Sequence, residues 1–356
     1  MASDSNIKRP FDPSQLKVEV KNTTIGALCD MLAHDMIDLQ PNFQRHANIW
    51  SDAKKSRFIE SIILGLPIPS LYFYIDYSNK KWVVIDGLQR LCALKDFMVD
   101  NKLKLSGLDF LSDYKDRKYD KFSYFERVEM SMRYVTLNII SGEASKDAIY
   151  IIFQRINSAG MTLRPAEVRN ALYSGKGMDF IKSIADDPEF LDVIDGAVST
   201  NRMMHYDYVS RFMAFYLNGY GNYKENMNVF LGDALTRMNK EEVDFEELRY
   251  EFFRSLHVCV DLLGEKAVFR SPIRDKSKKS NPMSITLFET MMCSVARLTD
   301  RQINQLLNNR DVYVSTYKAL FTNKYWVKYL SQGTGKPASV LYRFKTMETL
   351  VKNIVL

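Results

Sequence analysis

Cysteine and histidine are scarce in this sequence, which has four of each among 356 residues. The cysteines form no C-x-x-C pair, and each lies in an apolar segment, which is typical of reduced, buried thiols and indicates a reducing compartment. The histidines are isolated, and none belongs to an H-x-x-H, H-N-H or H-E-x-x-H pattern. A ββα-metal nuclease needs a histidine general base beside its metal ligands, so this sequence does not supply such a domain.

Long apolar runs are also absent. No uninterrupted apolar segment approaches the length of about 18 residues that indicates a membrane-spanning helix, and the first residues, MASDSNIK, lack the apolar core of a signal peptide. We therefore predict a cytoplasmic protein with no membrane partner. The composition, 46% hydrophobic and 26% charged, is that of a globular protein, and the net charge of +6 permits anionic partners without demanding them.

The patterns along the chain predict an α+β protein in three parts. Residues 1–22 are polar and show no clear period, so we predict an N-terminal arm or a loose first strand. Residues 23–175 alternate helical and strand patterns, which predicts a mixed α/β domain. Strand patterns vanish after about residue 175, and residues 176–356 are therefore predicted to form a helical domain.

Hydrophobic periodicity and capping residues predict individual elements. Thr24 and Ser51 are good N-caps for two helices, and in the second of these helices we expect Lys54, Lys55 and Glu60 to face outward. The remaining predictions are a strand over 37–40, a hairpin formed by 71–75 and 82–85, a helix over 88–99, a strand over 133–140, a helix over 144–156 and a short helix opened by Pro165.

Two clusters of polar residues follow predicted strands. The first, PNFQR, contains Gln44 and Arg45 and is followed by Trp50; the second, IDGLQR, contains Asp86, Gly87, Gln89 and Arg90. In the second cluster Gly87 permits a tight turn, and the first turn of the following helix offers backbone N–H groups to an anion. Arg90 can add charge-assisted hydrogen bonds, while Asp86 can hold Arg90, orient a water molecule or bind a metal. A salt bridge in an ordinary turn is the alternative interpretation.

A third cluster lies further along, in the segment IFQRINSAGMTL. It contains Arg155 and Asn157, and the segment AEVRNAL that follows contains Glu167, Arg169 and Asn170. Asn157 lies where a helix is predicted to end, a position at which asparagine is often only a C-cap.

Together, the segments PNFQR, FIESIILGLPIP, IDGLQR, IFQRINSAGMTL and AEVRNAL resemble the N-terminal domain of GmrSD-type restriction enzymes, in the same order and spacing. The resemblance covers about residues 20–175 and implies a ParB/sulfiredoxin-like fold. The family's signature is usually D-G-Q-Q-R; here it corresponds to Asp86, Gly87, Gln89 and Arg90, with Leu88 in place of the first glutamine. Leu88 is expected to point into the core.

The resemblance implies a site that binds, and hydrolyses, a nucleoside triphosphate with Mg²⁺, and so controls DNA cleavage in anti-phage defence. It assigns catalysis to Asp86, Gln89 and Arg90. It assigns nucleotide binding to a set that also draws on the first and third clusters: Gln44, Arg45, Gly87, Arg90, Arg155 and Asn157. We expect Gln44 and Arg45 to share one pocket with Asp86 and Arg90.

Three functions stay open at this point. The chain is a nucleotide-dependent regulator with a defence-system partner protein or a second copy as its partner, a Mg²⁺-dependent DNA nuclease in which Asp86 and Glu167 hold the metal, or a binding module with a vestigial nucleotide pocket. Two basic stretches, 266–279 and the residues from Asn308 onward, predict weak, salt-sensitive binding to double-stranded DNA. The loop SQGTGK at 331–336 lacks the spacing of a phosphate-binding P-loop.

Overall fold

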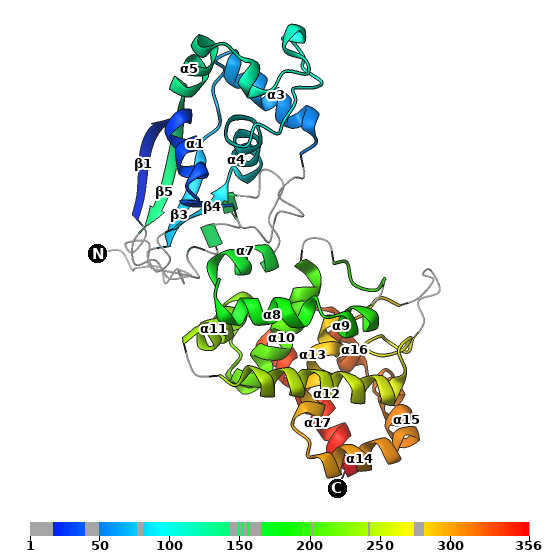
Figure 1. Ribbon diagram of the computed structural model, residues 1–356. Helices are drawn as coiled ribbons and strands as arrows, with labels where there is room; N and C mark the ends of the chain where they lie inside the picture. Colours follow the sequence, from blue (N-terminus) through cyan, green and yellow to red (C-terminus); the bar gives the residue numbers. More distant parts are fainter. Residues whose placement is uncertain are drawn as a thin grey trace, which may run out of the picture. The chain divides into compact units, whose positions relative to one another are not determined.

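The computed structural model describes residues 17–39, 50–76, 81–141, 149, 151–152, 155–156, 165–194, 196–200, 203–240, 243–273 and 281–355. The chain divides into two compact units, Met1–Leu163 and Arg164–Leu356 (Figure 1). Helix α7(Pro165–Leu172) begins at the proline predicted to open a helix. This helix lies in the second unit, while the boundary near residue 175 stays a prediction.

The first unit is built on a five-stranded mixed sheet, which confirms the α+β class. Its strands lie in the order β1-β5-β3-β4-β2, and their bounds are β1(Lys17–Thr24), β2(Ile37–Asp38), β3(Leu71–Asp76), β4(Lys81–Asp86) and β5(Tyr134–Ser141). β3 and β4 form the predicted antiparallel hairpin, whereas β3 pairs with β5 and β2 with β4 in parallel. Within the predicted strand over 37–40, β2 contains only the two residues Ile37 and Asp38.

Strand β1 confirms, for its own residues, the second of the two alternatives predicted for residues 1–22, a first strand. Its eight residues pair antiparallel with β5 over their full length, from Lys17 opposite Ser141 to Thr24 opposite Tyr134. Val18 and Val20 are 49% and 65% exposed, so the strand lies at an edge without a buried face that would give a strong sequence signal.

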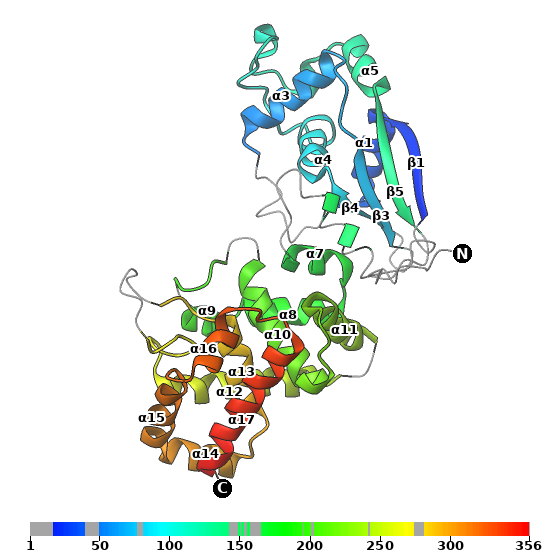
Figure 2. The ribbon, with the colours of Figure 1, turned by 180° about the vertical axis from the view of Figure 1, so that it is seen from behind.

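The helices of this unit cover one face of the sheet, and Figures 1 and 2 show them on the same side of the strands. Apolar side chains from that face and from the helices share one core, exemplified by Leu28, Ile59, Phe73, Leu91 and Leu137. The helices are α1(Ile25–Ala33), α3(Asp52–Ile63), α4(Leu88–Leu94), a π-helical turn over Lys95–Val99, and α5(Tyr124–Met132). Thr24 and Ser51 cap α1 and α3 as predicted.

Helix α3 also contains a correction, because two of its three predicted outward residues are buried. Lys54 is exposed, but Lys55 and Glu60 are each only 3% exposed. The Lys55 ammonium donates to Asp96 at 2.6 Å, and the Glu60 carboxylate accepts three backbone N–H groups of residues 109–111 at 2.7–3.0 Å. These partners compensate the desolvation of the two charges.

The second unit is helical throughout its described residues, as predicted. Besides α7 it contains α8(Lys176–Ala185), α9(Pro188–Val193), α10(Met204–Asn218), α11(Met227–Lys240), α12(Phe245–Leu263), α13(Ile285–Ala296), α14(Asp300–Asn308), α15(Arg310–Leu320), α16(Lys324–Ser331) and α17(Pro337–Val355). Helix α13 lies at the centre, and every residue from Thr286 to Ala296 is buried.

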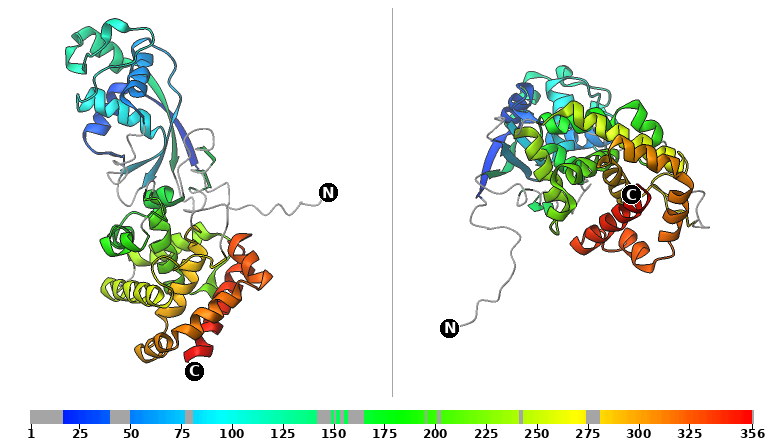
Figure 3. Two further views of the ribbon diagram at one scale, coloured as in Figure 1. Left: turned by 90° about the vertical axis from the view of Figure 1, so that its right-hand side faces the viewer. Right: turned by 90° about the horizontal axis from the view of Figure 1, so that it is seen from below.

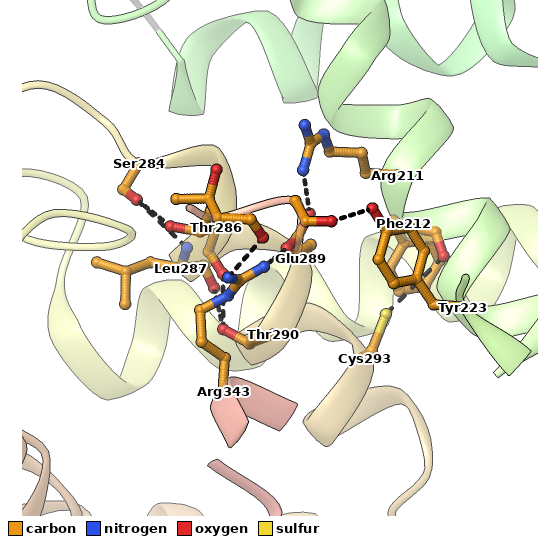
Figure 4. Close-up of polar contacts among 12 residues, drawn as sticks. Arg211, Phe212, Tyr223, Ser284, Thr286, Leu287, Glu289, Thr290, Cys293 and Arg343 are labelled. Atoms are coloured by element: carbon orange, nitrogen blue, oxygen red, sulfur yellow. Dashed lines mark hydrogen bonds and ion pairs between the residues drawn. The ribbon is translucent and has the colours of Figure 1, made fainter. Parts of the chain in front are cut away.

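A buried charge cluster joins three of these helices (Figure 4). Glu289 of α13 accepts from Arg343 of α17 at 2.7 Å and from Arg211 of α10 at 2.6 Å. Glu289 and Arg343 are fully buried, and Arg211 is 20% exposed. The cluster therefore fixes how α10, α13 and α17 pack.

Candidate functional site

The signature residues form a tight turn between β4 and α4. Asp86 is the last residue of β4, and Gly87 has φ +102°, a backbone conformation that other residues rarely adopt. A Cβ atom at position 87 would lie only 2.2 Å from Cδ2 of Leu71. Both the backbone angle and the contact with β3 therefore require glycine at this position.

Arg90 ties this turn to the segment that precedes β3. Its Nη2 donates to Oδ2 of Asp86 at 2.9 Å, and its Nη1 donates to the carbonyl oxygens of Pro69 and, at 3.3 Å, of Ser70. The Arg90 side chain is 11% exposed and that of Asp86 39%. Burial lowers the pKa of the Arg90 guanidinium, while the Asp86 carboxylate opposes this effect. The Arg90 guanidinium is thus largely occupied by hydrogen bonds within the protein, whereas the Asp86 carboxylate is partly exposed to solvent.

Gln89 connects the turn to the first cluster. Its side-chain oxygen accepts the backbone N–H of Trp50 at 3.1 Å, across 39 residues of sequence. Gln44 and Arg45 lie outside the described residues, so their predicted place in the same pocket stays a prediction. Trp50, which belongs to the same cluster, is nonetheless held beside the signature.

Trp50 lines a shallow hollow together with residues of α3. Its ring contacts Phe58 edge-to-face, with centroids 6.0 Å apart, and the Lys54 ammonium lies 5.0 Å from the indole centroid. Arg57, whose side chain is 54% exposed, also lines the hollow. An aromatic ring beside two cations suits a ligand that combines a flat ring with negative charge.

Leu88, the departure from the family signature, packs against the core of the first unit and is partly buried. This confirms the interpretation that its side chain points inward. The substitution therefore adds apolar contact at the start of α4 and leaves the Asp86–Arg90 pair intact.

The third cluster is only partly described. Arg155 is exposed and helical, Asn157 lies outside the described residues, and the side chain of Glu167 is not described. Arg169, in contrast, is 2% exposed and donates to Asp207 and, at 2.7 Å, to Asn228. Asp207 and Asn228 both lie in the second unit, so this arginine joins helices there.

The described residues contain no group of three or more His, Cys, Asp or Glu side chains arranged to hold a metal ion. Asp86 and Glu167, the two predicted metal ligands, fall in different units. The four cysteines are buried and unpaired, and burial raises the pKa of Cys29 to about 12 and of Cys92 to about 11. These two thiols are therefore poor nucleophiles and poor metal ligands at neutral pH.

Sequence reasoning missed the contacts that organise this turn. The acceptors for Arg90 are backbone carbonyls at Pro69 and Ser70, and the donor for Gln89 is the backbone N–H of Trp50. Contacts made by backbone groups do not depend on residue type, so the sequence does not reveal them. The only available signal was the presence of Trp50 shortly after PNFQR.

Residues 28–174 match the family model described as GmrSD restriction endonuclease, N-terminal domain. The match begins within α1 and ends just after α7, so it includes the whole β4–α4 turn. No curated protein and no solved structure matches the chain. None of the described helices is long and apolar enough to cross a bilayer.

Proposed function

Residues 28–174 belong to the GmrSD-type N-terminal domain family, and from this premise we propose that the chain is a nucleotide-binding regulator of a DNA-targeting restriction system. The family supports a restriction-related, DNA-directed role. The finer assignments, namely the nucleotide, its hydrolysis and the ParB/sulfiredoxin-like fold of the first unit, are part of this proposal. The observation that carries it is the β4–α4 turn inside the family match.

The turn has the chemistry expected of a phosphate contact. Among the described side chains none caps the first turn of α4, so its backbone N–H groups are available to an anion. Gly87 allows the anion to approach the backbone closely. Trp50, held against Gln89, offers a ring for the base. Gln44, Arg45, Arg155 and Asn157 are proposed to complete the nucleotide contacts.

Asp86 is the proposed contact to Mg²⁺; the role of Glu167 as a second ligand stays a prediction from the sequence. When bound with the nucleotide, Mg²⁺ would neutralise charge on the phosphates. Asp86 and Gln89 are proposed to orient a water molecule, and Arg90, which donates to Asp86, to keep that carboxylate in position.

One observation favours nucleotide binding over hydrolysis. The Arg90 guanidinium already donates to two backbone carbonyls and to Asp86, which leaves few N–H groups to stabilise charge that develops on a transferring phosphate. The geometry therefore supports nucleotide binding better than nucleotide hydrolysis, and we propose a domain that binds a nucleotide and signals its presence.

The test is a thermal-shift screen of the full chain against the four ribonucleoside triphosphates with Mg²⁺. A ligand that binds only the folded state stabilises it by about 2.7 kcal/mol at 100 times its Kd, so one of the four should raise the melting temperature by several degrees. Trp50→Leu should reduce that increment, whereas Tyr124→Leu, which changes an exposed aromatic residue on α5, should not. A screen in which no nucleotide shifts the wild-type protein would overturn the proposal.

A further inference from the structure

A long segment of the second unit carries no negative charge. Residues 312–347 contain six lysines and arginines and no aspartate or glutamate. Arg343 is buried in the cluster with Glu289, and the five lysines are exposed. The segment therefore differs from the rest of the chain in having five exposed lysines with no acidic residue between them in the sequence.

Four of these lysines are carried by α16, α17 and the loop between them, which Figures 2 and 3 show side by side. On α16, Trp326 is fully buried, and helical spacing places Lys324 and Lys328 on the opposite, outward face. Tyr325 is 64% exposed. We call Lys324, Tyr325, Lys328, Lys336 and Lys345 the α16–α17 surface.

The α16–α17 surface rests on a rigid base. Arg343 donates from Nη1 to the carbonyl oxygens of Tyr329 and Thr334, both at 2.9 Å, and so holds the end of α16 and the loop that carries Lys336. The Tyr223 hydroxyl donates to the carbonyl oxygen of Gly335 at 2.6 Å. Tyr329 of α16 also contacts Tyr342 of α17, with ring centroids 5.1 Å apart. The spacing of the lysines is therefore fixed by the fold.

We propose that the α16–α17 surface binds the phosphate backbone of double-stranded DNA. The proposal deepens the DNA-directed part of the proposed function and does not use the β4–α4 turn. Lysines spaced one turn apart on a fixed helix can each contact a phosphate, and duplex DNA presents such charges at high linear density. The exposed Tyr325 adds a hydrogen-bonding hydroxyl, and phosphate contacts commonly include such groups.

The buried face of α16 decides against a membrane surface as the partner. An interfacial helix inserts its apolar face between lipids, but here that face, with Trp326, already packs inside the unit. The exposed side chains around the α16–α17 surface combine the lysines with the scattered apolar residues Tyr325, Val327 and Leu341, which are too few to form the continuous apolar face of an interfacial helix. Contacts to backbone phosphates carry no base sequence, so binding should be independent of sequence and sensitive to salt.

The experiment measures fluorescence anisotropy of a short labelled duplex with the full chain over a series of salt concentrations. Lys324→Gln/Lys328→Gln should lower the slope of log K against log salt by about 2, because each lost phosphate contact removes about one unit. Lys104→Gln/Lys115→Gln, which changes two exposed lysines of the first unit, is the matched control and should leave the slope unchanged.

An unchanged slope in the Lys324→Gln/Lys328→Gln variant would overturn the proposal, and so would a wild-type protein that binds no duplex at low salt. Polyglutamate that competes as effectively as unlabelled duplex would also overturn it, because it would indicate an acidic protein partner. Both variants should melt with the wild type, because all four lysines are exposed. The nucleotide-induced thermal shift, measured on the same preparations, separates the two proposals. A variant that keeps this shift and loses DNA binding supports both, whereas DNA binding without any nucleotide shift would remove only the nucleotide site.

Discussion

Glu60 and Arg90 of the first unit use buried charge differently from Glu289 and Arg343 of the second, although the first unit also contains the ion pair of the buried Lys55 with Asp96. In the first unit, the buried or nearly buried Glu60 and Arg90 bind backbone groups of neighbouring loops. In the second unit, the buried Glu289 and Arg343 bind each other and join helices. The first arrangement fixes two separate loops, residues 109–111 by Glu60 and residues 69–70 by Arg90, and the second fixes the packing of a helical bundle.

This difference has an energetic consequence. A charge that is satisfied by backbone N–H or C=O groups loses hydrogen bonds when it is removed, but it leaves no second buried charge behind. A charge that is satisfied by an opposite charge leaves its partner desolvated and unpaired. Removing Glu289 from the second unit should therefore cost more than removing Glu60 or Arg90 from the first.

The largest effect is expected for Glu289→Gln. The change leaves Arg343 buried and Arg211 partly buried without a carboxylate, and breaking a buried pair in this way costs about 3–5 kcal/mol. Urea denaturation followed by circular dichroism measures the free energy of unfolding of the unit. The double variant Glu289→Met/Arg343→Met serves as the comparison: it removes the unpaired Arg343 charge but also the Arg343 hydrogen bonds to the carbonyl oxygens of Tyr329 and Thr334, so a double variant no less stable than the single one supports the charge effect. A single variant as stable as the wild type would show that the cluster does not bear on stability.

Much of the fold followed from sequence patterns because those patterns are local. The helix caps at Thr24 and Ser51, the β3–β4 hairpin and the strand near 134–141 are each set by neighbouring residues. Strand β1 was predicted only as an alternative to an arm, because its pairing with β5 joins residues more than 100 positions apart, and Val18 and Val20 face solvent. Long-range pairing of an exposed edge leaves little signal in the local pattern.

The errors on α3 have a different origin. Lys55 precedes Ile59 by four residues and therefore lies on the same helical face, so the spacing alone predicted burial. The charge of the side chain led to the opposite prediction. Its partner, Asp96, is 41 residues away in the sequence, and no local pattern shows that a buried charge is paired.

The candidate site shows the same division. The tight turn between β4 and α4 and the inward side chain of Leu88 could be predicted from the sequence. The partners of Arg90 and Gln89 could not, because all but Asp86 are backbone groups.

A smaller effect is expected for Arg90→Ala. The variant loses the donors to Pro69, Ser70 and Asp86, and because Asp86 is partly exposed it can be hydrated instead. We expect a loss of about 2–3 kcal/mol in the free energy of unfolding, in the range for charge-assisted hydrogen bonds. Arg57→Ala removes a more exposed arginine of the same unit and should cost below about 1 kcal/mol. Equal losses for the two variants would contradict the role assigned to Arg90.

The smallest effect is expected for Glu60→Gln, together with a characteristic dependence on pH. Burial by itself would raise the pKa of Glu60, but hydrogen bonds from the backbone N–H groups of Asp109, Leu111 and Phe110, with Arg57 nearby, lower it overall. The unfolded state therefore binds the proton more readily than the folded state, so the stabilisation is complete above the ordinary glutamate pKa and is lost as the pH falls through the lowered value. Glutamine keeps one acceptor oxygen, and we expect a loss of about 1–2 kcal/mol at neutral pH. Denaturation of the wild type and the variant across this acidic range should show the difference shrinking as the pH falls; a difference that stays constant would show that the Glu60 charge is not what holds residues 109–111.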